Sequence, residues 1–116
     1  MFVSATILVE SSGKPRAFNE KSRAAGLMQI RQIALEQVRE AYPHERFSNN
    51  LFNPDNNIKV GVAYLTYLVE EYEIKNHDAL AVSFSSGPIK GKRFSRKPTK
   101  NEYVHRIKKM IRLLTN

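Results

Sequence analysis

The sequence predicts a mostly α-helical fold of about five helices in a single domain. Apolar residues recur at helical spacing along most of the chain, Gly and Pro residues separate these stretches, and no stretch alternates as a half-buried strand does. With 116 residues the chain is long enough for one domain and too short for two. Hydrophobic residues make up 41% and charged residues 26%, as in globular rather than disordered chains.

The first two segments are expected to be a short helix and a long loop. Residues 1–10 carry apolar side chains at helical spacing, and Gly13 and Pro15 end this pattern because proline cannot continue a helix. Residues 11–25 are rich in Ser, Asn, Lys and Arg, so we expect a loop there.

Two longer helices are expected in the middle of the chain. The first begins near Gly26 or Leu27 and ends at about Ala41. Its apolar stripe consists of Leu27, Ile30, Ala34, Val38 and Ala41. The second opens with Asn53 as N-cap and Pro54 at the first helical position. Its apolar repeat is the strongest helical signal in the chain and comprises Ile58, Gly61, Val62, Leu65, Leu68, Val69 and Tyr72.

The C-terminal part predicts two more helices, separated by a basic loop. A short helix covers about residues 78–86 and stops at the Gly-Pro pair that follows. Residues 90–100 hold six Lys or Arg and no acid, which indicates either a solvated loop or a patch facing the substrate. The last helix is predicted to start at Thr99, in a capping box with Glu102.

The charge and residue usage limit the possible functions. A formal net charge of +8 predicts attraction to polyanions such as nucleic acid, anionic lipid or bacterial wall polymers. The absence of Cys excludes disulfides and cysteine nucleophiles, and the three His residues lack ligand spacing, so no metal site is expected. No apolar run reaches the roughly 18 residues that span a membrane. The apolar start lacks a basic leader, so no signal peptide is expected.

Five separated blocks carry the functional signal. Residues 9–15 read Val-Glu-Ser-Ser-Gly-Lys-Pro, residues 25–30 read Ala-Gly-Leu-Met-Gln-Ile, and residues 57–68 follow the pattern N-I-x-x-G-x-x-Y-L-x-x-L. Residues 79–88 read Ala-Leu-Ala-Val-Ser-Phe-Ser-Ser-Gly-Pro, and residues 103–107 read Tyr-Val-His-Arg-Ile. In this order the blocks resemble the E-S-S-x-N-P, G-L-M-Q-I, N-I-x-x-G-x-x-Y-L, A-L-A-x-Y-N-A-G-P and Y-V-x-R motifs of lytic transglycosylases and goose-type lysozymes.

The resemblance implies a compact lysozyme-like domain with a substrate cleft and Glu10 as its single catalytic acid. Glu10 would protonate the bond between N-acetylmuramic acid and N-acetylglucosamine. It would then act as base on the muramoyl C6 hydroxyl, whose attack on C1 gives a 1,6-anhydro product. Burial at the end of an apolar segment would raise the pKa of the Glu10 carboxyl and keep it protonated. The expected partner is the peptidoglycan glycan strand, and no cofactor is expected.

The resemblance also implies substrate contacts for further residues, namely Ser11, Ser12, Met28, Gln29, Tyr64, Phe84, Ser85 and Tyr103. Simple loop hydrogen bonding is the alternative role for the two serines after Glu10, and core packing is the alternative for the methionine and the two tyrosines.

Several positions depart from the family pattern. Ser85 replaces the usual Asn and Phe84 the usual Tyr, which removes groups that would hold the sugar. Arg23 stands where the family usually has Gly. Because the chain begins only nine residues before Glu10, we also allow for a truncated first helix.

Three other functions stay open at this point. A lysozyme-type hydrolase of the same fold would use water in place of the C6 hydroxyl. A wall-binding module with impaired catalysis would fit the departures at Phe84 and Ser85. A nucleic-acid binder is supported by charge alone, since no recognition motif is present. Without a signal peptide, we favour a phage virion or lysis protein over the wall-opening domain of a conjugation or secretion system.

Overall fold

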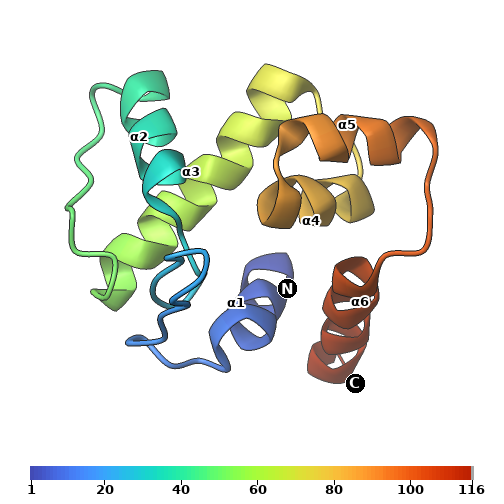
Figure 1. Ribbon diagram of the computed structural model, residues 1–116, viewed down its shortest axis with the longest axis horizontal. Coiled ribbons are helices and arrows are strands. Elements are labelled where there is room, and N and C mark those ends of the chain that lie inside the picture. The colour runs from blue at the N-terminus through green and yellow to red at the C-terminus, as the bar shows by residue number, and fades with distance from the viewer. Residues whose placement is uncertain (116) are drawn as a thin grey trace. The chain divides into compact units, whose positions relative to one another are not determined.

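Six α-helices make up the regular structure of residues 1–115, the part of the chain that this computed structural model describes (Figure 1). Along the chain they are α1 (Phe2–Ser11), α2 (Gln32–Ala41), α3 (Pro54–Tyr72), α4 (His77–Ser86), α5 (Pro88–Arg96) and α6 (Glu102–Thr115). Within residues 1–115 no strand is present, although isolated β-bridges pair Phe18 with Ala25 and Ala25 with Ile30. The predicted mostly α-helical class is confirmed, with one helix more than expected.

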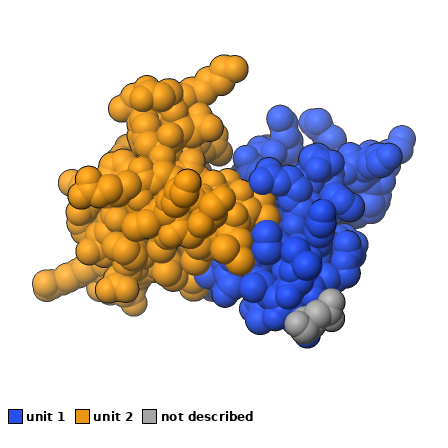
Figure 2. Space-filling model, turned by 90° about the horizontal axis from the view of Figure 1, so that it is seen from below, with its two compact units in different colours: residues 1–5, 65–116 blue, residues 6–64 orange. Residues whose placement is uncertain are grey.

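The chain divides into two compact units (Figure 2). Unit 1 comprises Met1–Ala5 and Leu65–Asn116, and unit 2 comprises Thr6–Tyr64. Unit 2 contains α2 together with the loops on either side of it, and unit 1 contains α4, α5 and α6. The prediction that residues 1–116 form a single lysozyme-like domain stays a prediction.

In unit 2, α2 begins at Gln32, five or six residues later than predicted. Gly26 and Gln29 adopt φ of 79° and 51°, values that a right-handed helix does not use. The backbone N–H of Ala25 donates to Ile30 O at 3.0 Å, and that of Ile30 donates to Ala25 O at 2.9 Å. Residues 25–30 therefore form a short hairpin, called here the 25–30 hairpin. The predicted helix start near Gly26 or Leu27 was wrong, because apolar spacing gives no information about positive φ, whereas the predicted end at Ala41 is confirmed.

The start of α3 was predicted correctly. Asn53 is the N-cap, since its Oδ1 accepts a hydrogen bond from the Asn56 backbone N–H at 2.9 Å, and Pro54 takes the first helical position. Side chains on α2 and α3 then form the interior of unit 2. Leu35, Val38 and Val60 are fully buried there.

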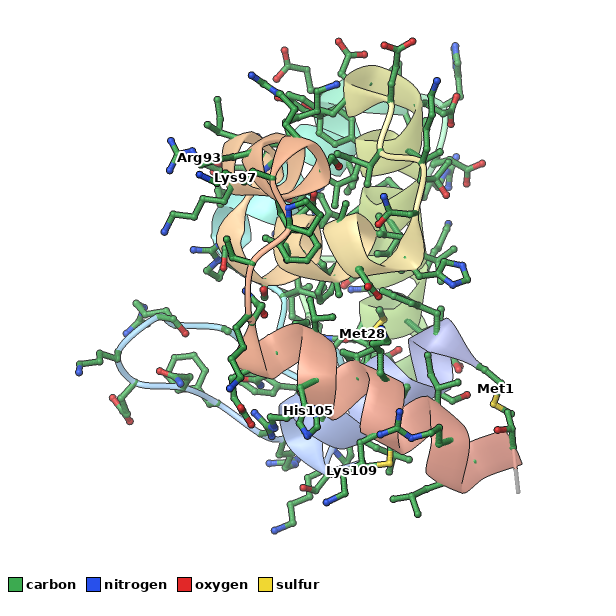
Figure 3. All side chains as sticks on the ribbon, turned by 90° about the vertical axis from the view of Figure 1, so that its right-hand side faces the viewer. Met1, Met28, Arg93, Lys97, His105 and Lys109 are labelled. Carbon is green, nitrogen blue, oxygen red and sulfur yellow. The ribbon has the colours of Figure 1, made fainter. Side chains whose placement is uncertain are left out.

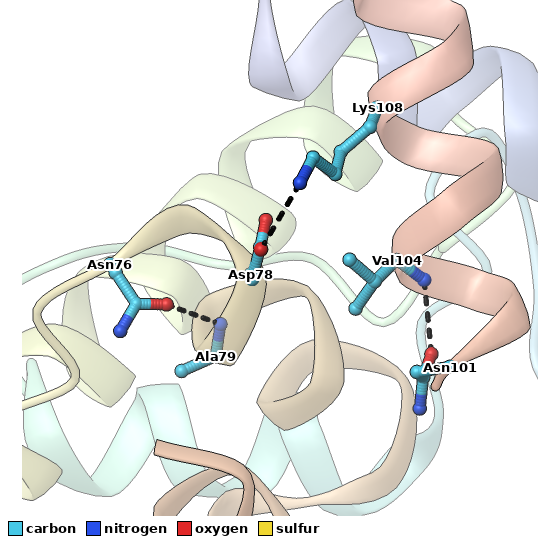
Figure 4. Close-up of polar contacts among 6 residues, drawn as sticks. All are labelled: Asn76, Asp78, Ala79, Asn101, Val104 and Lys108. Carbon is cyan, nitrogen blue, oxygen red and sulfur yellow. Dashed lines mark hydrogen bonds and ion pairs between the residues drawn. The ribbon is translucent and has the colours of Figure 1, made fainter. Parts of the chain in front are cut away.

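In unit 1, asparagine side chains cap two helices (Figure 4). Asn76 Oδ1 accepts from the Ala79 N–H at 2.8 Å at the start of α4. Asn101 Oδ1 accepts from the Val104 N–H at 3.0 Å at the start of α6. The predicted capping box of Thr99 with Glu102 was therefore wrong. Asparagine is the stronger N-cap and lies two residues further along the chain.

The basic segment is largely helical and is not the loop that was predicted. Pro88 opens α5 directly after Gly87, whose φ is 95°. At Gly91 a Cβ would collide with Ser83 Oγ, so a side chain there would push α5 away from α4. Figure 3 shows Arg93 extending outward from α5. Spacing of three and four residues places a set of exposed cations on one side, called here the basic face: Lys90, Arg93 and Lys97.

Within residues 1–115 no helix is both long enough and apolar enough to cross a lipid bilayer.

Candidate active site

Glu10 lies in the last turn of α1 with its side chain half-buried. The next residue, Ser11, is buried, and its Oγ donates to Ile7 O at 2.9 Å and accepts from the Gly13 N–H at 3.2 Å. Ser12 is exposed and has a φ of 56°, a left-handed conformation that ends many helices. The serine hydroxyl at position 11 thus stabilises the end of the helix that carries Glu10, whereas Ser12 exposes its side chain beside it.

A series of hydrogen bonds joins the end of α1 to the 25–30 hairpin. The Lys14 N–H donates to Ser11 O at 3.1 Å, and the Ala17 N–H donates to Lys14 O at 3.2 Å. Ala17 O then accepts from the Gly26 N–H at 2.8 Å and from Gln29 Nε2 at 3.1 Å. The loop after Glu10 is therefore fixed step by step to the segment that contains Gln29.

The side chain of Gln29 holds the 25–30 hairpin closed. Its Nε2 donates to Ala17 O and to Gly26 O, both at 3.1 Å. These two bonds use both hydrogens of the amide nitrogen, and Oε1 takes no part in them. A role for Gln29 toward a sugar hydroxyl would therefore fall to Oε1, which can only accept.

Asn57 is a structural residue of this site that sequence reasoning missed. It is fully buried at the start of α3, and its Oδ1 accepts from the Met28 N–H at 2.8 Å. Its Nδ2 donates to Ala25 O at 2.9 Å and to Leu51 O at 2.7 Å. One amide thereby connects the 25–30 hairpin, the loop before α3 and α3 itself.

A sequence signal for Asn57 existed. It lies three, four and seven residues before Val60, Gly61 and Tyr64, all of which are buried, so it occupies the buried side of the helix. A polar residue on such a stripe is expected to have hydrogen-bond partners inside the protein.

Two glycines make room for this arrangement. At Gly26 the φ is 79°, and a Cβ would collide with Asn57 Nδ2 and Leu51 O. At Gly61 a Cβ would collide with the sulfur of Met28. Met28 is fully buried against this glycine, and Tyr64 is 6% exposed. Both side chains pack in the interior of unit 2.

The remaining predicted contacts lie in unit 1. Phe84 is 8% exposed, whereas Ser85 and Tyr103 are half-buried. Ser85 Oγ donates to Val82 O at 3.3 Å and lies 3.3 Å from Ser86 Oγ. Unit 2 thus contains Glu10 with the first five of its predicted companions, and unit 1 contains the other three. The predicted substrate cleft stays a prediction.

The chemistry that this site offers rests on one carboxyl group. Glu10 can donate or accept a proton, and the residues after it bring hydroxyl and amide groups. Within residues 1–115, His, Asp and Glu side chains do not gather in threes as metal ligands would.

Comparison with known proteins identifies the family. The model of the Transglycosylase SLT domain matches residues 1–107. Two curated relatives share the name endo-type membrane-bound lytic murein transglycosylase A. The protein from Cronobacter sakazakii is 39% identical over 97 residues, covering 73% of this chain and 46% of its own length. The protein from Citrobacter koseri is 34% identical with the same coverage. This chain therefore spans about half the length of these relatives. Since the family model matches most of the chain, it belongs to the transglycosylase SLT domain family, as its five sequence blocks predicted.

Proposed function

We propose that this chain is a peptidoglycan lytic transglycosylase. It cleaves the β-1,4 bond between N-acetylmuramic acid and N-acetylglucosamine and leaves a 1,6-anhydro end on the muramic acid. Family membership supports this function, as do the names of two relatives, which are lytic murein transglycosylases. The proposed substrate is the glycan strand of periplasmic or cell-wall peptidoglycan.

Glu10 is proposed to act first as acid and then as base. Its carboxyl proton passes to the leaving glycosidic oxygen as the bond to C1 breaks and positive charge develops at C1. The resulting carboxylate then takes the proton of the C6 hydroxyl, whose oxygen bonds to C1. The carboxyl group returns to its starting state, so one residue and no external water complete the cycle.

The observation that carries this proposal is the hydrogen-bond series from Ser11, the neighbour of Glu10, to Gln29. A general acid must be held within hydrogen-bond reach of its substrate atom. The series gives the carboxyl-bearing helix end and the amide-bearing hairpin a fixed connection inside unit 2. We further propose that the exposed Ser12 and Gln29 Oε1 contact the sugar.

The proposed contributions of unit 1 are more limited. Ser85 and Tyr103 would contact the glycan, Tyr103 with aromatic ring surface and Ser85 with a short hydroxyl. Phe84, like Met28 and Tyr64 of unit 2, would act through packing, because all three are buried. Delivery by a phage virion or a secretion system stays a prediction from the sequence.

The test is digestion of purified peptidoglycan followed by mass spectrometry of the soluble products. Wild-type protein should release anhydro-muropeptides, and Glu10→Gln should lower the rate by about 100-fold or more, since general acid catalysis contributes about that much. Glu20→Gln is the matched control, because Glu20 is an exposed acid of the loop after α1. It should leave the rate unchanged. Circular dichroism verifies that both variants fold.

Two results would contradict the proposal in different ways. Products with ordinary reducing ends would make the chain a lysozyme-type hydrolase, in which water replaces the C6 hydroxyl. The wild-type protein could also release no product from a sample that a known wall enzyme digests. That result would favour the hypothesis of a wall-binding module.

A further inference from the structure

A hollow of about 480 Å³ lies in unit 2, and none of the predicted site residues lines it. Its walls come from three segments that are far apart in the sequence: the loop around residues 18–25, the start of α2 at residues 31–33, and the loop at residues 49–52. Its volume is within the range of about 300–1,000 Å³ that small-molecule sites occupy. The hollow is therefore large enough for a ligand fragment such as a short peptide.

Two aromatic rings form an apolar surface in this hollow. Phe18 is 40% exposed and Phe52 is 42% exposed, and their ring centroids lie 6.2 Å apart at an interplanar angle of 51°. Ile33, also in the lining, is 57% exposed. Grouped exposure of large apolar side chains is typical of binding surfaces, whereas single exposed residues are ordinary.

The charge at this hollow has one sign. Arg23 and Arg31 line it, and no acidic side chain does. The Arg23 guanidinium lies over the Phe18 ring, 5.3 Å from its centroid. Among residues 1–115 neither arginine is engaged in an ion pair. The chemistry of the lining therefore suits an anion that has an apolar part.

Arg23 also has an unusual backbone. Its φ is 61°, in the left-handed region that favours glycine, and its N–H donates to Asn19 O at 2.7 Å. Asn19 Oδ1 in turn accepts from the N–H groups of Lys21 and Ser22, which fixes the turn. An arginine is thus held at a position whose backbone would suit glycine better, with its side chain on the wall of the hollow. Unfavourable local geometry of this kind is a reason to look for a function.

We propose that this hollow binds a free carboxylate of the peptide stems attached to the glycan strands of peptidoglycan. The guanidinium groups of Arg23 and Arg31 contact the carboxylate, and the rings of Phe18 and Phe52 contact an apolar side chain beside it. The proposal rests on the proposed function, because it takes peptidoglycan as the substrate. It adds a preference to that function, because binding of the peptide stem favours cleavage of strands that carry peptides over bare glycan strands.

The direct test is NMR titration of the isotope-labelled Glu10→Gln chain, in which the proposed catalytic acid is removed. The probe is a disaccharide-tetrapeptide muropeptide with free carboxylates. It should perturb the amide signals of Arg23, Asn50 and Phe52. The same compound with amidated carboxylates, and the peptide-free disaccharide with its lactyl carboxyl amidated, should leave those three signals in place.

Variants sharpen this test. Arg23→Gly removes the guanidinium while keeping a backbone that tolerates positive φ, so the loop should fold as before. It should raise the Kd about three- to tenfold, as expected for a charged hydrogen-bonding group. Arg31→Gln should act in the same direction and does not touch the strained turn. Lys21→Gln is the control, because it removes one charge from the same loop outside the lining, and its Kd should match the wild-type value.

Three outcomes would overturn the hollow proposal. The first is that the amidated compound perturbs the three amide signals as much as the free carboxylate does. The second is that Arg23→Gly and Lys21→Gln bind the muropeptide with the same Kd. The third is that glycerol phosphate oligomers perturb these amide signals and the muropeptide does not. Failure of the proposed function is a separate result. Binding at the hollow by a protein that cleaves no peptidoglycan would refute catalysis alone, and cleavage without binding there would refute the hollow alone.

Discussion

Replacement of Asn57 by Ala should destabilise the protein far more than the position of this residue at a helix start would indicate, because its side chain is fully buried. The change removes three side-chain hydrogen bonds. Ala25 O keeps the bond from the Ile30 N–H, so the Met28 N–H and Leu51 O are the two buried groups that lose a partner. At about 1–3 kcal/mol for each buried group left unsatisfied, the free energy of unfolding should fall by about 2–6 kcal/mol. This is a large part of the roughly 5–15 kcal/mol that stabilises a typical domain.

The neighbouring residue gives a matched control. Asn56 also makes three side-chain hydrogen bonds, accepting from the Ser48 N–H and donating to Ser48 O and Asn50 O, but these bonds are exposed. Water can replace them, so Asn56→Ala should cost less than about 1 kcal/mol. Both variants replace Asn by Ala in the same helix, so the change in helix propensity is the same for both and cancels in the comparison.

Urea unfolding of the two variants, followed by circular dichroism, measures this difference directly. Asn57→Asp adds an isosteric version, in which an acceptor replaces Nδ2 and faces the carbonyl oxygens of Ala25 and Leu51. It should be at least as destabilising as Asn57→Ala. If Asn57→Ala costs no more than Asn56→Ala, the reasoning that this buried amide holds the 25–30 hairpin is refuted.

Gly26→Ala should cost about 1–3 kcal/mol more than Gly13→Ala, because both positions have positive φ but only at Gly26 would the Cβ meet neighbouring atoms; equal losses in urea unfolding would contradict this. Asn101→Ala should lower the free energy of unfolding by about 1 kcal/mol, and Thr99→Ala by less than about 0.5 kcal/mol; the reverse order would restore the Thr99 cap. Reversing the charges of the basic face should weaken cosedimentation with anionic wall polymer about tenfold at low salt and less at high salt; binding that is insensitive to both changes would make the basic face an ordinary solvated surface.

The elements that the sequence predicted correctly are those with local causes. Asn53 and Pro54 open α3 through a cap and a fixed φ, which act within a few residues. The start of α2 was predicted wrongly because the 25–30 hairpin depends on Asn57, which lies 29 residues after Met28. α5 was not predicted because a segment so rich in cations has the composition of a loop. The helix is supported by the close approach of Gly91 to α4, which lies outside the segment itself.

The candidate site shows the same division. The five sequence blocks, taken in order, were sufficient to predict the family, which the comparison confirmed. They were not sufficient to predict which polar groups the protein itself uses. The hydroxyl of Ser11 and the amide nitrogen of Gln29 are both engaged by backbone groups, which a sequence does not reveal.

The second and third sequence blocks describe one structural unit, although they are separate in the chain. Gly26 in the second block makes room for the side chain of Asn57 in the third, and Gly61 in the third makes room for Met28 in the second. Each block therefore supplies a glycine where the other supplies a side chain. Because the Asn57 amide also binds the Met28 N–H, this exchange fixes the position of the residue directly before Gln29. Most of the second block thus serves to hold the hairpin, and the side-chain oxygen of Gln29 is left out of the hairpin bonds.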